Sequence, residues 1–146
     1  MKKLLLTITL ILFTICSRSW GGEFDEKGLV CKRSQVDVPQ VYYFENGNVR
    51  AATIDEEKLE VKYSIFSTYE AKPTKISWTY RIEEENVDLL YTWQLDKNNL
   101  KMVLSKHNLI KDKTRRAFFL CSILNNLGEI EEYFQPKIDK IKEEIQ

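Results

Sequence analysis

The sequence contains few of the residues that build metal and catalytic sites. It has one His and three Cys among 146 residues, and a zinc site needs three or four such ligands. No Gly-x-Ser-x-Gly element, P-loop or dinucleotide-binding fingerprint occurs in it. The single imidazole, His107, lies in a Lys-rich segment where nothing specifies a partner for a general base. We therefore expect a protein that is not an enzyme and that holds neither a metal nor a cofactor.

The sequence also lacks an excess of charge and any strong compositional bias. Its 22 Lys and Arg balance 22 Asp and Glu, which gives no argument for a nucleic-acid partner. Five Gly and three Pro exclude collagen and low-complexity disorder, and 43% hydrophobic residues is ordinary for a folding chain. The length suits one domain.

The only long apolar run lies near the N-terminus and is too short to span a bilayer comfortably. Two lysines precede the twelve residues Leu4–Ile15, and small residues stand at positions −3 and −1 of a cut after Ser19. This layout predicts a signal peptide over residues 1–19 and an exported protein, periplasmic or extracellular, with no stable membrane span after cleavage. A buried N-terminal helix or strand and an uncleaved anchor are the alternatives. Lipidation of Cys16 is disfavoured, because a lipobox wants a small residue where Ile15 stands.

Cleavage would leave two cysteines, Cys31 and Cys121, in the mature chain. An even pair in an exported protein predicts one disulfide, because the compartment is oxidising. Two buried free thiols are the alternative.

From residue 28 onward, after a loose leader over residues 20–27, apolar and polar residues alternate with period 2. The clearest local signal is Asn46-Gly47 between two such runs. This dipeptide favours a two-residue type I′ turn, because both residues accept positive φ, and such a turn fixes the register of the hairpin. The predicted pairs are Phe44 with Val49, Tyr42 with Ala51 and Tyr43 with Arg50.

Further runs continue the alternation, separated by polar turns at Glu83–Asn86 and Asp96–Asn99. Turns of four residues would place Ile82 opposite Val87 and Leu95 opposite Leu100. Residues 105–115 are interpreted as a polar, basic connector. The predicted strands after the hairpin are Leu59–Tyr69, Ile76–Ile82, Val87–Leu95, Leu100–Leu104 and Arg116–Ile123.

The tail, residues 126–146, changes to helical spacing. Asn126 with Glu129 three residues later is typical of a capping box. Pro136 predicts either a kink or a helix that starts there. The apolar stripe consists of Ile130, Phe134, Ile138, Ile141 and Ile145.

These elements predict an all-β domain over residues 28–124, mainly an antiparallel meander of about eight strands, followed by one amphipathic helix. Closure of the meander into a small barrel would remove the sheet edges and make the first and last strands neighbours. Cys31 and Cys121 lie on those two strands, so the disulfide favours a barrel. A two-sheet sandwich that brings the strands together stays open.

The order of elements resembles the lipocalin-like superfamily in architecture alone. The Gly-x-Trp motif of lipocalins is absent, and Trp20 precedes two glycines instead. A signal peptide followed by Gly-Gly-Glu and then by Gly28-Leu29-Val30-Cys31 is similar to small exported bacterial proteins. The first resemblance implies a barrel that can enclose a small apolar ligand, and the second implies no activity.

Aromatic residues on the predicted inward face suggest a function. They either enclose a small apolar or amphipathic ligand or fill the barrel as a packed core. The first reading is an exported, non-enzymatic binding module. The alternative is a packed β-domain that meets a protein or envelope partner through its C-terminal helix or the basic 105–115 connector. The inward set is Tyr63, Trp78, Tyr80, Tyr91, Trp93 and Phe119.

Overall fold

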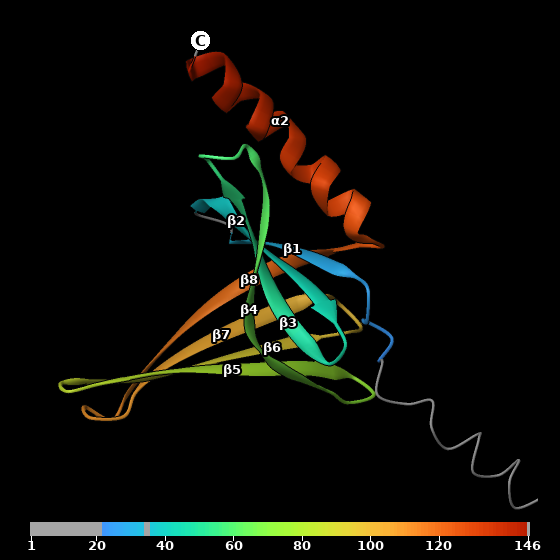
Figure 1. Cartoon of the computed structure of the whole chain (residues 1–146). Coiled ribbons are helices and arrows are strands. Elements are labelled where there is room, and N and C mark those ends of the chain that lie inside the picture. The colour runs from blue at the N-terminus through green and yellow to red at the C-terminus, as the bar shows by residue number, and fades with distance from the viewer. Residues whose placement is uncertain (1–21, 34–35, 146) are drawn as a thin grey trace, which may run out of the picture.

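The chain forms a closed antiparallel barrel whose eight strands follow one another in chain order, with one helix after the last strand (Figure 1). The computed structural model describes residues 22–33 and 36–145, so the predicted signal peptide lies outside the described residues. The all-β fold with a C-terminal helix is confirmed, and the barrel replaces the sandwich. The elements are β1 (Gly28–Arg33), β2 (Val36–Glu45), β3 (Asn48–Asp55), β4 (Glu60–Ala71), β5 (Lys75–Glu84), β6 (Val87–Asp96), β7 (Lys101–Asn108), β8 (Lys113–Leu124) and α2 (Leu127–Ile145).

The Asn46-Gly47 hairpin has the predicted register, with Phe44 opposite Val49. Both turn residues have positive φ, 52° and 76°, as a type I′ turn requires. The two later registers are wrong by two residues: Ile82 pairs with Leu89, and Leu95 pairs with Met102. The β5–β6 turn is tighter than expected, and Leu100 leaves the ladder in a left-handed conformation with φ 55°. Because side chains alternate with period 2, a shift of two residues keeps every side chain on its predicted face.

The polar connector expected over residues 105–115 is wrong, because most of it is strand. Ser105–Asn108 belong to β7, Lys113–Arg115 belong to β8, and the turn is confined to residues 109–112. These strand ends project from the barrel and are wetted on both sides, so they need no apolar alternation. Because their sequence is polar, these strand ends were predicted as a connector instead of as strands.

The leader expected to be loose over residues 20–27 is ordered in its described part and closes one end of the barrel. Phe24 is 3% exposed and meets the Phe44 ring edge-on, with the two ring centroids 6.0 Å apart. The Glu26 N–H donates to the Phe44 carbonyl at 2.7 Å, and the Phe44 N–H donates to the Lys27 carbonyl at 2.9 Å. The segment therefore acts as a plug with Phe24 at its centre.

At the other end the strands separate, and part of the sheet projects. β4 and β5 pair only where Tyr69–Ala71 meet Ile76–Trp78, and the β1–β8 pairing ends at Lys32 and Leu120. Beyond these pairs the far ends of β5–β8 extend away from the β3–β4 hairpin (Figure 1). We call this projecting part, residues 79–92 and 105–116, the arm.

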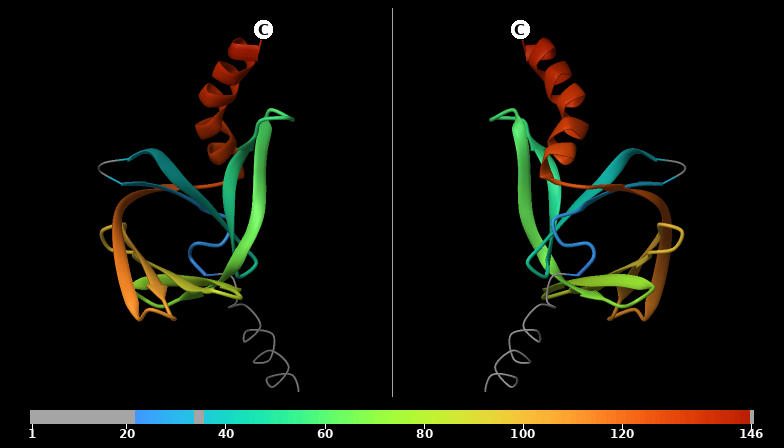
Figure 2. Two further views of the ribbon diagram at one scale, coloured as in Figure 1. Left: turned by 90° about the vertical axis from the view of Figure 1, so that its left-hand side faces the viewer. Right: turned by 90° about the vertical axis from the view of Figure 1, so that its right-hand side faces the viewer.

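Helix α2 packs on the outside of the barrel. It begins at a reciprocal cap: the Glu129 N–H donates to Asn126 Oδ1 at 3.0 Å, and the Asn125 N–H donates to Glu129 Oε2 at 2.7 Å. Figure 2 shows the helix between the β1–β2 hairpin and the β3–β4 hairpin. The helix continues through Pro136 instead of starting there. Its buried residues, Ile130, Phe134 and Ile138, form an outer cluster with Val30, Val41, Tyr43 and Ala52.

Gly28 is required where the helix approaches β1. A Cβ atom at this position would lie 2.7 Å from Ile130 Cδ1 and 3.2 Å from Leu124 Cβ. Ile130 is fully buried and cannot swing into solvent. We expect Gly28→Ala to lower the free energy of unfolding by about 1–3 kcal/mol, the usual cost of overpacking.

Urea denaturation of Gly28→Ala, Ile130→Ala and the double variant tests this expectation. The double variant should lose less than the sum of the single losses, since removal of the Ile130 side chain vacates the space that the new methyl group needs. Additive losses would show that the two groups do not compete.

Candidate functional site

The barrel interior is filled by its own side chains. The parallel indole rings of Trp78 and Trp93 stack with centroids 6.0 Å apart and are only 2% and 5% exposed. Tyr42 meets Trp78 edge-on at 5.1 Å. Such low exposure leaves almost no water-sized space beside these rings. The buried inner cluster consists of Phe24, Leu29, Cys31, Tyr42, Phe44, Val49, Ile76, Trp78, Trp93, Leu95, Met102, Phe119 and Cys121.

A part-buried polar pair lies at the edge of the inner cluster, near the disulfide. The Tyr42 hydroxyl donates to Gln40 Oε1 at 2.5 Å. Burial raises the pKa of Tyr42 well above its usual value, and the nearby Trp93 indole lowers it in part. The hydroxyl is therefore neutral, and Gln40 supplies its hydrogen-bond acceptor.

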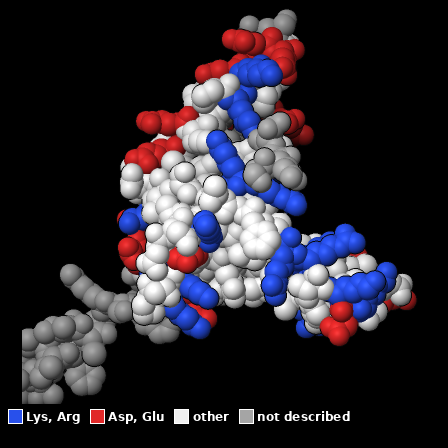
Figure 3. Space-filling model, turned by 180° about the vertical axis from the view of Figure 1, so that it is seen from behind, with Lys and Arg blue, Asp and Glu red and all other residues white. Residues whose placement is uncertain are grey.

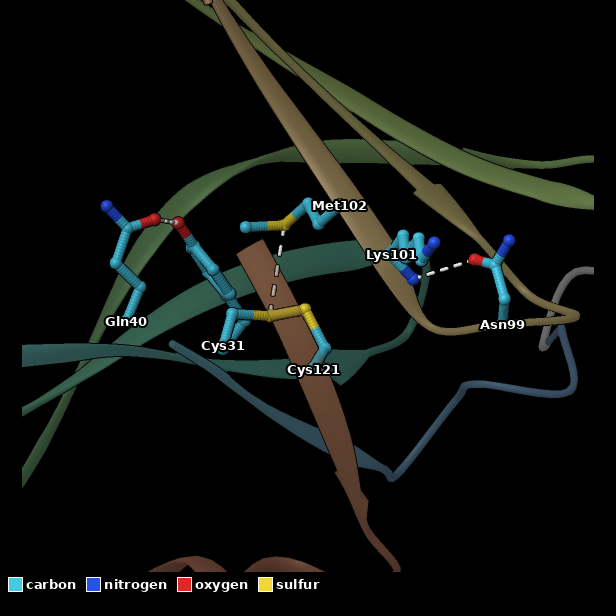
Figure 4. The surroundings of a disulfide bond; sticks show 7 residues. Cys31, Gln40, Asn99, Lys101, Met102 and Cys121 are labelled. Carbon is cyan, nitrogen blue, oxygen red and sulfur yellow. Dashed lines mark hydrogen bonds between the residues drawn. A yellow bond between two sulfur atoms is a disulfide. The ribbon is translucent and has the colours of Figure 1, made fainter. Parts of the chain in front are cut away.

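The disulfide predicted between Cys31 and Cys121 is confirmed. The two residues lie directly opposite one another on β1 and β8, with Cα atoms 4.0 Å apart. Figure 4 shows Met102 over the bridge, its Sδ 3.9 Å from Cys31 Sγ. Because the bridged sulfur carries no proton, this is a van der Waals contact. The bridge joins the first and last strands across the seam of the barrel.

The row of inward aromatics continues beyond the packed interior onto the arm. Tyr91 stacks on Trp93 with centroids 5.9 Å apart, and Phe66 stacks on Tyr80 at 4.9 Å. The Phe66–Tyr80 stack bridges β4 and β5 beyond the point where their backbone pairing ends. Tyr80 is 42% exposed, so the row changes from buried to open along the strands.

Tyr63 does not belong to this row, and its predicted inward position is wrong. It lies in the outer cluster, edge-on to Tyr43 at 5.8 Å. Burial, with Glu131 of the helix as a smaller cause, raises the pKa of Tyr63 to about 12. The register of β3 and β4 shifts by one residue between Val49 and Arg50, which makes Phe66 an extra residue on β4. This bulge exchanges the faces of the strand, so Tyr63 points outward although Tyr69 packs inside.

The inner face of the arm holds an open groove of about 390 Å³. Side chains that alternate inward along β6 provide its apolar wall, and those along β7 and β8 provide a basic wall. Figure 3 shows Lys and Arg gathered over the projecting arm at the lower right of the view. The lining residues are Asn86, Val87, Leu89, Lys106, Asn108, Lys111, Lys113 and Arg115.

Three of the groove cations are neighbours by register. Lys106 lies directly opposite Arg115. Two residues further toward the β7–β8 turn, on the same face, Lys113 lies opposite Asn108. Lys106 extends over the Tyr91 ring, with Nζ 5.4 Å from its centroid. In the described part of the chain, no carboxylate oxygen lies within ion-pair distance of Lys106, Lys111, Lys113 or Arg115.

His107 lies on the opposite face of β7 from this groove. Its Nδ1 is 2.7 Å from Thr114 Oγ1, and its Nε2 is 3.6 Å from the exposed carboxylate of Asp112. No grouping of three His, Cys, Asp or Glu side chains suited to a metal ion occurs in residues 22–33 and 36–145.

The sequence therefore indicated the aromatic row and the basic residues but not their combination. If residues 105–108 and 113–115 had been predicted as strands, the alternation of side chains would have placed Lys106, Lys113 and Arg115 on the same face of the sheet as Tyr91. Phe66 gave no signal, because only the bulge turns it inward.

Comparison with protein-family models, with curated proteins and with solved structures found no match to this chain. The function must therefore be argued from the geometry.

Proposed function

We propose that this protein is an exported, non-enzymatic binding module that holds a small amphipathic ligand on the inner face of its arm. The observation that carries this proposal is the groove, where an apolar wall and a basic wall meet beside the open end of an aromatic row. Its volume lies within the roughly 300–1,000 Å³ that is typical of small-molecule sites.

The ligand position in this proposal differs from the centre of the barrel. Trp78, Trp93 and Phe119 face inward but pack against their neighbours. Around these three residues the barrel interior therefore offers no space for a ligand. Tyr80 and Tyr91 lie where the same face opens. The packed inner cluster provides a rigid support, and the open apolar face of the arm beside it is where a ligand can bind.

Export is supported by two independent features. The first nineteen residues have the layout of a signal peptide, and the buried Cys31–Cys121 bridge is of a kind that persists in oxidising compartments. No helix in the described ranges is long and apolar enough to cross a bilayer.

The groove should bind simple amphiphiles. We expect decanol below its solubility limit, and decanoate below its critical micelle concentration, to shift backbone amide resonances of residues 86–91, 105–108 and 113–116. Resonances of the plug around Phe24 should not move. Tyr91→Ala should weaken both ligands about three- to tenfold, because an aromatic contact contributes roughly 0.5–1.5 kcal/mol beyond its buried area.

Phe118→Ala is the matched control, since Phe118 is an exposed ring on the outer face of β8, with no part in the groove. It should leave both affinities unchanged. Absence of shifts with both probes, or shifts confined to the outer face, would refute the proposal.

A further inference from the structure

We propose that the ligand of the arm groove carries an anionic group, which Lys106, Lys113 and Arg115 hold while the apolar chain lies along β6. This inference rests on the proposed function and names the chemical class of its ligand: a single-chain amphiphile with a carboxylate or phosphate head.

The first support is a repulsion that the fold does not relieve. Lys106 and Arg115 lie directly opposite on neighbouring strands, and Lys113 is two residues from Arg115 on the same face. Like charges at directly opposite positions destabilise a sheet. With no carboxylate in ion-pair distance among the described residues, a bound anion is the partner that would relieve this repulsion.

The second support is the direction of the polar groups. The Lys106 ammonium group lies over the Tyr91 ring and therefore remains at the inner face. Asn108 Oδ1 accepts the Lys111 N–H at 2.8 Å, which leaves the amide NH₂ as the group that Asn108 offers to the groove. The groove thus presents donors and positive charge.

The third support is the separation of the two walls. Val87, Leu89 and Tyr91 follow one another on the inner face of β6, and Leu89 pairs with Asn108 across the ladder to β7. Of the acidic side chains nearby, Asp88 lies on the outer face of β6 and pairs with Arg81 at 2.8 Å. Glu84 shares the inner face, opposite Val87, but it lies on β5, on the side of β6 away from the basic wall, and it does not line the groove. A molecule with an apolar chain and an anionic head fits this division.

The test compares decanoate, decyl phosphate and decanol as ligands of the disulfide-bonded protein by calorimetric titration. We expect at least one of the two anionic probes to bind about tenfold or more tightly than decanol, because several exposed charge contacts contribute a few-fold each. A preference between decanoate and decyl phosphate identifies the head group. Equal affinity for all three probes would overturn the inference while leaving the proposed function intact, whereas no binding of any probe would overturn both.

Variants give a second readout on the same residues. The double variant Lys106→Gln, Arg115→Gln should lose the preference for the anion, and in the absence of ligand its urea midpoint should rise, since the repulsion is gone. The control Lys101→Gln, Arg116→Gln removes two exposed cations from the outer faces of the same strands and should retain the preference. An equal loss of preference in both variants, or a preference that survives in the first, would overturn the inference.

Discussion

Replacement of both Cys31 and Cys121 by Ala should lower the free energy of unfolding by about 2–5 kcal/mol without changing the fold. The bridge spans a sequence separation of 90 residues, and the loop it closes in the unfolded chain is correspondingly long. In the chain-entropy model a loop of that length contributes about 4–5 kcal/mol, and strain or residual structure reduces the measured value. Alanine is the suitable replacement, because a serine hydroxyl would be buried without a partner in the inner cluster.

Urea denaturation of the oxidised protein and of the double alanine variant measures this loss. The wild type after complete reduction should resemble the variant, because β1 and β8 still pair along Gly28–Lys32. Circular dichroism should report retained strands in both. A variant as stable as the oxidised protein would show that the bridge does not constrain the unfolded chain.

Trp78→Ala should cost about 3–5 kcal/mol, the usual loss for a buried Trp. The indole contacts Tyr42, Phe44 and Trp93, and it is nearly inaccessible to solvent. Its removal would leave a cavity that these rigid neighbours cannot close. Tyr80→Ala is the matched control on the same strand and face, and it should cost about 1 kcal/mol because its ring is partly in water already.

Circular dichroism should follow both unfolding transitions, since one variant loses a fluorophore. A large difference between the two losses is expected if the inner cluster is a packed core. Similar small losses would mean that the indole lines a space, and the ligand site would then lie deeper than the arm.

The sequence predicted the parts of the barrel where local patterns are decisive. Asn46-Gly47 gave the hairpin register because the two positive φ values leave few alternatives. The period-2 alternation gave the inward face of β5, β6 and β7, since even a register error of two residues preserves the face. The pairing of Cys31 with Cys121 was predicted because these two cysteines remain after the predicted cleavage, and it in turn favoured closure of the meander.

The sequence failed where the backbone departs from simple alternation. The extra residue at Phe66 exchanged the faces of β4, and with them the position of Tyr63. A bulge of this kind has no period of its own, so a strand that contains one still resembles a regular strand. The β7–β8 part of the arm was missed for a different reason, because strand ends that bury neither face carry no apolar signal.

The seam between β1 and β8 also has a consequence for the order in which the molecule folds. Every other pairing in the barrel joins consecutive strands and can form locally while the chain is still short. Gly28 must find Leu124, so the ring of strands cannot close until nearly the whole chain is available. Loop closure over such a distance is the slow kind of step in β-proteins. The native disulfide of Cys31 therefore cannot form until β8, which carries Cys121, has been added to the sheet.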